Sequence, residues 1–409
     1  MPPTGQNGKQ RLPSHIFDLP VQEIRRGYRS DIYFWREKRA LEEHGMHPEV
    51  TLQVFQKKDA ILCGIDEAIA VLKLGSGTYR DFDQACKLFD RYLELKHEAR
   101  KHFLTDREKY MATVREKTEI SARLDDLWTP HYEDLVLEAL HDGDRIAPWE
   151  TVMHITGDAS LFAHLETVYL GVLARRTRIA TNVRRTVDAA GDKVVLFFPA
   201  RFDHWAVQGG DGYAAHIGGA GGVSTDAQGE WWGESAKGTV PHALIAAVGG
   251  DTVQAVKLFD DSFPDVNLVA LVDFDNDCVG TSLQCCEALG DRLWGVRLDT
   301  AGTMVDRSMI PRMGEEPPTG VTPQLVESTR RELDRHGYEH VRIIVSGGFH
   351  PDRIRMFEDM AVPVDAYGVG SSLMRGHWDF TADVVLREGE PCAKQGRTYH
   401  PNARMERVM

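Results

Sequence analysis

Side chains that could bind anions or handle phosphate follow apolar runs in the second half of the chain. Arg201 comes shortly after the run Val194–Phe198. Arg297 and Asp299 lie at the end of the run Leu293–Leu298. In parallel α/β folds the carboxyl ends of the strands meet at one edge, and active sites are built there. The pattern predicts one site that combines cations and carboxylates at that edge.

Two glycine- and serine-rich turns follow later apolar runs. Ser346, Gly347 and Gly348 come after one run, and Gly370 and Ser371 come after the next. Turns of this kind ahead of a helix present backbone N–H groups, which makes them anion sites. Barrels often bind phosphate in their last two βα loops. The alternative is that both are tight turns that need small residues. Two successive late turns favour the phosphate interpretation.

Carboxylates are concentrated in the same region. Asp273, Asp275 and Asp277 follow one apolar run, and Asp299 follows the next. Clustered carboxylates could hold Mg²⁺, which takes oxygen ligands and bridges to substrate phosphates. Asp273 and Asp299 are the candidate ligands. These residues could instead stabilise a cationic centre in a transition state, or cap helices, where aspartate is favoured.

His242 lies in the segment Gly238–Ile245 (GTVPHALI), directly after Pro241 and near the expected start of a helix. A neutral imidazole at such a place could act as a general base or as a nucleophile. A single histidine in this setting is more often structural, so position alone leaves its role open.

Apolar runs alternate with helical segments from about residue 161 onward. The strand candidates are Val194–Phe198, His216–Gly219, Leu268–Asp273, Leu293–Leu298, Val341–Val345 and Val364–Val369. The helix candidates are Thr252–Phe259, Gly280–Leu289, Pro323–His336 and Asp352–Met360, and residues 308–322 read as a surface loop. Apolar strands separated by helices indicate parallel βα units, and this many favour a (β/α) barrel. A doubly wound open sheet is the alternative.

The first 160 residues have a mixed α/β pattern. Helices are expected at 31–43 and 65–74, and strands at 51–56 and 151–155. Residues 80–117 form a charge-dense helical stretch, which we interpret as a surface helix pair or an interface element.

The bulk composition excludes several classes of protein. The chain has 409 residues and a formal net charge of -14, so non-specific nucleic-acid binding is not expected. The six cysteines lack zinc-site spacing and suggest reduced thiols. There is no signal-peptide pattern and no run near the ~18 apolar residues of a membrane span. We therefore expect a cytoplasmic protein with no membrane partner.

Four motifs in order carry a resemblance to a known family. They are Gly238–Ile245 (GTVPHALI), Gly295–Thr300 (GVRLDT), Ser346–Phe349 (SGGF) and Tyr367–Leu373 (YGVGSSL). Weaker support comes from Ser30–Arg36, Leu165–Ala180, Ala215–Ser224 and Pro391–Arg397. With these motifs the chain resembles the nicotinate phosphoribosyltransferases, within the type II phosphoribosyltransferases, over about residues 31–397.

The resemblance implies an α/β fold in which an irregular (β/α) barrel packs on an N-terminal α/β domain that the C-terminal tail completes. The expected limits are a flexible tail at 1–20, the N-terminal domain at 21–160, the barrel at 161–380 and the C-terminal tail at 381–409. It also implies a homodimer with shared active sites, because in this family the partner subunit completes each site. Asp31 and Tyr33 match that donated element.

The resemblance assigns roles to the remaining positions. Phe198 matches the aromatic residue that stacks on the pyridine ring, Arg201 the arginine on the nicotinate side, and Ser224 a position where an aspartate marks nicotinamide-specific relatives. Arg297 and Asp299 match residues around the ribose and diphosphate, with Asp273 nearby. The cradle for the 5-phosphate is matched by Ser346, Gly347, Gly348, Gly370 and Ser371. His242 matches a histidine that ATP phosphorylates.

The implied function is nicotinate phosphoribosyltransferase activity in NAD biosynthesis. Nicotinate and phosphoribosyl pyrophosphate would give nicotinate mononucleotide and pyrophosphate, with Mg²⁺ as the metal and ATP as a co-substrate coupled through a phosphohistidine. The loop at Phe198 departs from the family pattern, since Phe197, Pro199 and Phe202 replace an acidic residue, a glycine and a second arginine.

Three alternatives stay open. The same fold could act on nicotinamide or on quinolinate, whose second carboxylate would need extra cations such as Arg175, Arg176 or Arg178. A non-catalytic regulator that binds phosphoribosyl ligands would be expected to have lost His242, Arg297 or Asp299, and all three are present. An aldolase-type barrel would need a lysine at a strand end, and the strand ends named above carry none.

Overall fold

The computed structural model describes residues 10–314 and 317–408. The chain divides into two compact units. The central unit comprises residues 178–376, and the terminal unit comprises the described residues of 3–177 together with 377–408. Helix α7 (Glu166–Ala190) contributes residues to both units. Part of the predicted N-terminal tail, residues 1–9, lies outside the described residues. The predicted domain limits stay predictions.

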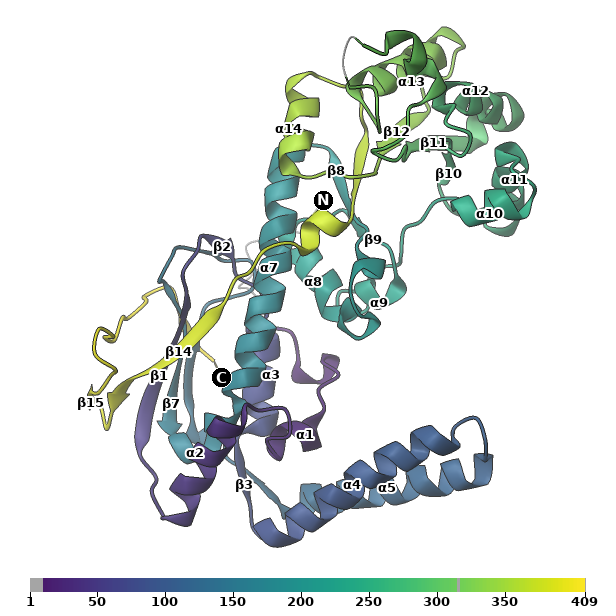
Figure 1. Cartoon of the computed structure of the whole chain (residues 1–409). Helices are drawn as coiled ribbons and strands as arrows, with labels where there is room; N and C mark the ends of the chain where they lie inside the picture. Colours follow the sequence, from purple (N-terminus) through teal and green to yellow (C-terminus); the bar gives the residue numbers. More distant parts are fainter. Residues whose placement is uncertain (1–9, 315–316, 409) are drawn as a thin grey trace. The chain divides into compact units, whose positions relative to one another are not determined.

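The terminal unit is built on a six-stranded antiparallel sheet in the order β15-β14-β1-β7-β5-β16 (Figure 1). The strands are β1 (Glu49–Gln56), β5 (Val136–Ala139), β7 (Thr151–Asp158), β14 (Phe380–Arg387), β15 (Glu390–Pro391) and β16 (Glu406–Arg407). Strand β14 pairs with β1 along its length, so residues from the end of the chain complete a sheet begun near its start. The strands predicted at 51–56 and 151–155 are confirmed within β1 and β7.

The described part of the terminal unit also contains four short helices and two small two-stranded sheets. The helices are α1 (Val21–Arg25), α2 (Ile32–Glu43), α3 (Ile65–Gly75) and α6 (Ala159–Phe162). The two-stranded sheets pair β2 (Ala60–Ile61) with β6 (Arg145–Ile146) and β3 (Gly77–Tyr79) with β4 (Trp128–Pro130). Helix α3 is apolar on most of its surface and is almost entirely buried, and it shares one core with β1, β7 and the start of α7.

The charge-dense stretch forms a long antiparallel hairpin of α4 (Phe82–His102) and α5 (Arg107–Leu127) (Figure 1). Each helix begins at an aspartate whose side chain accepts a backbone N–H, Asp81 from Gln84 and Asp106 from Lys109. Such caps satisfy one of the free N–H groups at a helix start. A small apolar core around Phe89 and Leu124 joins the two helices. The predicted surface helix pair is therefore confirmed.

Glu166, at the start of α7, lies among other carboxylates. Burial, together with the charges of Glu37, Asp383 and Asp31, raises the pKa of Glu166 from about 4.5 to about 8. Between those two values the folded chain holds a proton that the unfolded chain has lost, so stability falls as the pH rises through this window.

Glu166→Gln removes that titration. We expect thermal unfolding of the variant and of the wild type to agree near pH 5, where the wild-type carboxyl is protonated in the fold, and the variant to be the more stable near pH 8.5. Calorimetry at the two pH values measures the difference. A difference in stability between variant and wild type that is equal at the two pH values would contradict the raised pKa.

The central unit contains a curled, six-stranded, all-parallel sheet in the order β10-β11-β12-β13-β8-β9. The strands are β8 (Val194–Phe197), β9 (Gly222–Val223), β10 (Leu268–Leu271), β11 (Leu293–Leu298), β12 (Arg342–Val345) and β13 (Ala366–Val369). They are largely buried, as expected of parallel strands covered on both faces. Five of the six predicted strands are confirmed within one or two residues of each end.

The central helices are α8 (Gln208–Gly218), α9 (Asp226–Gly229), α10 (His242–Ala247), α11 (Thr252–Ser262), α12 (Cys278–Leu289), α13 (Pro323–Arg335) and α14 (Pro351–Asp359). The strand predicted at His216–Gly219 is wrong, because these residues end α8. Gly218 lets this helix approach α7, since a Cβ there would lie 2.6 Å from Val183 Cβ. The loop predicted at 308–322 also contains a 3₁₀ helix, Arg307–Arg312.

The segment 237–240 bridges the two edges of the central sheet. The Lys237 N–H donates to the Val223 carbonyl of β9 over 2.8 Å, and the Val240 N–H donates to the Val269 carbonyl of β10 over 3.4 Å. The bridge brings His242, two residues further on, to the same edge as the carboxyl ends of the strands. Among the described residues, no helix is both long and apolar enough to cross a membrane.

Candidate active site

The loop after β8 carries the predicted aromatic and cationic residues. Phe198 continues the strand edge, because its N–H donates to the Val369 carbonyl of β13 over 2.9 Å. A short 3₁₀ helix, Ala200–Phe202, follows and places Arg201 on the exposed side of the loop. The Phe198 ring lies against Gly368, where a Cβ would be 2.8 Å from Phe198 Cε2. A glycine at 368 therefore leaves room for the ring beside the strand.

Arg297, Asp299 and Ser346 meet where β11 and β12 end. Ser346 Oγ donates to Asp299 Oδ1 over 2.7 Å, and Arg297 Nη2 lies 3.6 Å from Asp299 Oδ2. Arg297 Nη1 also donates to Thr239 Oγ1 over 2.7 Å, while its buried Nε has no hydrogen-bond partner. Burial lowers the pKa of the Arg297 guanidinium, and the charges of Asp299 and Asp273 oppose that effect. A buried donor without a partner suits an anionic ligand at this point.

The two glycine-rich turns border the same space. Gly347 and Gly348 have φ values of 86° and 76°, in the left-handed region that favours glycine. A Cβ on Gly347 would also lie 3.3 Å from Asp299 Oδ1. Gly370 and Ser371 follow β13 at the start of a 3₁₀ turn. The turns leave backbone groups open to a ligand where a side chain would crowd the carboxylate.

His242 and Asp273 form a hydrogen-bonded pair. His242 Nε2 lies 3.0 Å from Asp273 Oδ1, with the imidazole 44% exposed and the carboxyl 8% exposed. Burial raises the pKa of Asp273 above its ordinary value, and the contact with His242 partly offsets the rise. A carboxylate acceptor fixes the proton on Nε2 and leaves the Nδ1 lone pair available. The geometry suits a histidine that acts as a nucleophile rather than one that only packs.

Most of the predicted site residues line one cavity of about 670 Å³ in the central unit. They are Phe198, Arg201, Ser224, His242, Arg297, Asp299, Ser346, Gly347, Gly348, Gly370 and Ser371. Asp273 does not line the cavity but is hydrogen-bonded to His242, which does. The Ser224 hydroxyl donates to Gln228 Oε1 over 3.2 Å, within the capping box of α9, so part of its hydrogen-bonding capacity is already used.

Asp31 and Tyr33 belong to the terminal unit and do not line this cavity. Asp31 precedes α2, and its carboxylate accepts a hydrogen bond from Thr167 Oγ1 over 3.1 Å. Tyr33 is 60% exposed on the first turn of α2. Both side chains lie on the surface of their unit, where a partner molecule could reach them.

Residues outside the predicted set also line the cavity or support the residues that line it. Thr239 accepts the hydrogen bond from Arg297, and Gly368 supports Phe198. Both lie inside motifs that carry the family resemblance, so their position within a motif was the available signal. Lys237 also lines the wall, with its stem across Gly222 and its ammonium on the Gly221 carbonyl at 3.0 Å.

A metal site made of protein ligands alone is not built here. Among residues 10–314 and 317–408, no three histidine, cysteine or acidic side chains are grouped closely enough to hold an ion. Asp299 and Asp273 supply two carboxylates. Mg²⁺ commonly uses one or two carboxylates together with waters and substrate phosphates. The donor set therefore fits an ion that arrives with a diphosphate.

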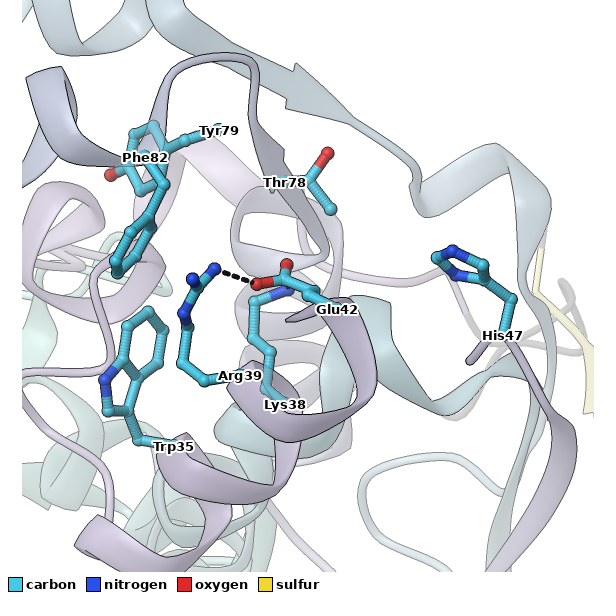
Figure 2. A pocket seen from close by; sticks show the side chains of 8 residues that line it. All are labelled: Trp35, Lys38, Arg39, Glu42, His47, Thr78, Tyr79 and Phe82. Atoms are coloured by element: carbon cyan, nitrogen blue, oxygen red, sulfur yellow. Dashed lines mark hydrogen bonds and ion pairs between the residues drawn. The ribbon is translucent and has the colours of Figure 1, made fainter. Parts of the chain in front are cut away.

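A second pocket, of about 210 Å³, lies beside α2 in the terminal unit (Figure 2). Arg39 lies beside Phe82, with its Cζ 3.5 Å from the centre of the Phe82 ring. Its guanidinium pairs with Glu42 at 2.6 Å, and Lys38 pairs with the same carboxylate at 2.9 Å. The charges are matched within the protein, and none of the predicted site residues lines this pocket.

Comparisons with known proteins identify the family of the chain. No family model matches the chain. The crystal structure of a nicotinate-nucleotide pyrophosphorylase from Pyrococcus furiosus is 30% identical, with a TM-score of 0.70, and the match covers 96% of this chain and 85% of that one. The chain belongs to the nicotinate phosphoribosyltransferase family, within the type II phosphoribosyltransferases. The family predicted from the four motifs is thereby confirmed.

Two further proteins are similar to the chain. Nicotinate phosphoribosyltransferase pncB1 of Mycobacterium tuberculosis is 29% identical over 271 residues, which are 63% of this chain. The chain spans about half the length of that relative, 55%. Human nicotinic acid phosphoribosyltransferase has a TM-score of 0.62 at 15% identity, over 90% of this chain and 77% of that one, and supports the fold alone.

Proposed function

We propose that this chain is a nicotinate phosphoribosyltransferase, which joins nicotinate to phosphoribosyl pyrophosphate and releases pyrophosphate. The observation that carries the proposal is the single cavity in which an aromatic residue and a free cation, Phe198 and Arg201, share walls with a carboxylate pair and two glycine turns. A base, a ribose and a phosphate each have a chemically suitable surface there.

The base would lie on Phe198, with Arg201 at its carboxylate. Aromatic rings stack favourably in offset geometry, and a guanidinium can bind a carboxylate through two hydrogen bonds. No described carboxylate forms an ion pair with Arg201, so its charge is available to a ligand. Ser224 at the same wall is neutral, which avoids the repulsion that an acidic residue would impose on nicotinate.

The phosphoribosyl group would lie between Asp299 and the glycine turns. Gly347, Gly348, Gly370 and Ser371 would bind the 5-phosphate through N–H and hydroxyl groups. Bond breaking at the ribose C1 leaves positive charge on the sugar, which the Asp299 carboxylate can stabilise, while Arg297 faces the negative diphosphate. Bound Mg²⁺ would neutralise charge on the leaving diphosphate. The ring nitrogen of the base then forms the new bond to C1.

His242 would couple ATP to this reaction. With Nε2 held by Asp273, the Nδ1 lone pair can attack the terminal phosphorus of ATP. The bond between that phosphorus and the ADP oxygen breaks, and ADP leaves. The phosphohistidine so formed would be hydrolysed later in the cycle. Asp273 would stabilise the positive charge that the ring acquires during attack.

The assembly is also proposed by analogy with the family. Asp31 and Tyr33 of a second copy would close the base site of the first, in a homodimer with shared active sites. The irregular barrel would occupy 161–380, and the tail at 381–409 would complete the N-terminal domain at 21–160. The pairing of β14 with β1 supports the last assignment.

Product formation and base binding test the proposal. We expect the protein to form nicotinate mononucleotide from nicotinate and phosphoribosyl pyrophosphate, faster with ATP than without it. Titration calorimetry with nicotinate, nicotinamide and quinolinate should give the tightest binding for nicotinate. Arg201→Gln should weaken nicotinate binding by about 10-fold or more, because it removes a charge-assisted bidentate contact. Absence of the mononucleotide with wild-type protein would refute the proposal.

Quinolinate is the second candidate base. The two relatives carry different enzyme names. The one at 30% identity is a nicotinate-nucleotide pyrophosphorylase, and the Mycobacterium relative is a nicotinate phosphoribosyltransferase. Lys237 offers a second cation at the wall, although its ammonium lies on the Gly221 carbonyl and 3.8 Å from Glu234. Tighter binding of quinolinate than of nicotinate would favour this candidate.

A further inference from the structure

Two phenylalanines of the loop after β8 each rest on a glycine at the end of β13. Phe198 lies against Gly368, and Phe202 lies against Gly370, where a Cβ would be 2.7 Å from Phe202 Cε2. The Phe202 N–H donates to the Pro199 carbonyl over 2.8 Å, which ties the residue into the 3₁₀ turn. The loop therefore contacts the wall of the proposed phosphate cradle at one ring and the proposed base site at the other.

Arg201 lies between these two aromatic residues in the sequence and turns toward one of them. Its Cζ lies 5.4 Å from the centre of the Phe202 ring, within the range of a cation–π contact. Phe202 is 47% exposed although it is large and apolar. Because the side chain is exposed, packs on a glycine and faces a cation, filling the hydrophobic core does not explain its position.

The phosphate groups of the proposed substrate would compete with the carboxylate of the base for Arg201. The proposed 5-phosphate and diphosphate are multiply charged anions, and a flexible guanidinium beside them would pair with them in preference to a monocarboxylate. The Phe202 ring occupies the space next to Gly370, on the side of the phosphate cradle. An uncharged ring holds the cation by its electron-rich face and leaves the positive charge free for the base.

We propose that Phe202 is a positioning residue for base selection, whose ring holds the Arg201 guanidinium at the cavity wall, where it can bind the carboxylate of the base. This inference rests on the proposed function. It predicts that the ring of residue 202 affects how well the enzyme distinguishes nicotinate from nicotinamide, since only nicotinate carries the charge that Arg201 binds.

Steady-state kinetics with both bases test the inference, with Phe202→Leu and Phe202→Tyr as a matched pair. Leucine keeps an apolar side chain and removes the ring face, whereas tyrosine keeps the ring. For Phe202→Leu we expect the ratio of kcat/KM for nicotinate to that for nicotinamide to fall by about three- to five-fold, the size of an exposed cation–π contact. Phe202→Tyr should keep the wild-type ratio, and KM for phosphoribosyl pyrophosphate should stay near the wild-type value in both.

A double-mutant cycle makes the test specific to Arg201. In an Arg201→Gln background, Phe202→Leu should produce no further change in the ratio, because the cation that the ring positions is gone. Circular dichroism melts of each variant verify that the fold is kept. If the wild type does not prefer nicotinate, the proposed function is wrong about the base and this inference fails with it.

Other outcomes separate the two proposals. A wild type that prefers nicotinate, with Phe202→Leu at the same ratio, would overturn the role of Phe202 and leave the proposed function standing. A change confined to KM for phosphoribosyl pyrophosphate would also overturn it, since the ring would then serve only the phosphate cradle. An equal fall of the kcat/KM ratio in Phe202→Leu and Phe202→Tyr would overturn it as well, because a side chain that keeps the ring would then fail to keep the preference.

Discussion

Asp299→Asn should lower kcat/KM for phosphoribosyl pyrophosphate by about 100-fold, the usual effect of removing one preorganised electrostatic group from a transition state. The carboxylate accepts from Ser346 at 2.7 Å, lies 3.6 Å from Arg297 and borders Gly347. Asparagine has the same shape and can still accept from Ser346 through its amide oxygen. The variant therefore removes charge from the centre of the cavity while leaving the turn in place.

The same substitution at Asp275 is the control. Asp275 is exposed, follows the neighbouring strand β10 and does not line the cavity. Asp275→Asn changes the net charge by the same amount and should keep near wild-type activity. Initial rates over a range of phosphoribosyl pyrophosphate concentrations, at saturating nicotinate and Mg²⁺, provide the comparison. Near wild-type kcat/KM for Asp299→Asn would exclude Asp299 from the reaction centre.

His242→Ala should abolish the stimulation of the reaction by ATP while leaving transfer without ATP near the wild-type rate. The phosphate acceptor would be lost, because no other described histidine lines the cavity. ATP hydrolysis that depends on the protein and covalent labelling from ATP phosphorylated at its terminal position should disappear as well. Acid-labile, alkali-stable label on the wild type is the expected signature of a phosphohistidine.

Two further variants sharpen the result for His242. Asp273→Asn keeps a hydrogen-bond acceptor for Nε2 and removes the charge, so slower labelling is expected with the acceptor nitrogen still present. His340→Ala changes an exposed histidine away from the cavity and should label like the wild type. Full labelling of His242→Ala would assign the phosphate to another residue and refute the coupling role.

Local signals predicted most of the elements that build the scaffold. Helix α13 begins at Pro323 behind Thr322, whose hydroxyl accepts the Leu325 N–H over 3.2 Å. Both residues are visible in the sequence as a helix start. The strands of the central sheet were predictable because each is a short, continuously apolar run. The strand predicted at His216–Gly219 was wrong because a short apolar run with glycines fits a strand and a helix end equally well.

The candidate site was predictable as a set of residues but not as a set of contacts. His242 and Asp273 were both expected to matter, yet their hydrogen bond depends on the bridge at 237–240, which no periodic pattern marks. Phe202 looked like the loss of a family arginine. Its contact with Gly370, across 168 positions of the chain, gives the ring a place in the site.

Local periodicity and capping residues were enough to predict most of the strands, helices and turns, and the side chains that stand at strand ends. The sequence also carried the four motifs that indicate the family. Three features became visible in the folded chain alone: which strand ends are neighbours, the buried Arg297 donor without a partner, and the contact of Arg201 with a phenylalanine. Those features depend on packing between segments far apart in the chain, where the free energy is set by close contacts that no local pattern records.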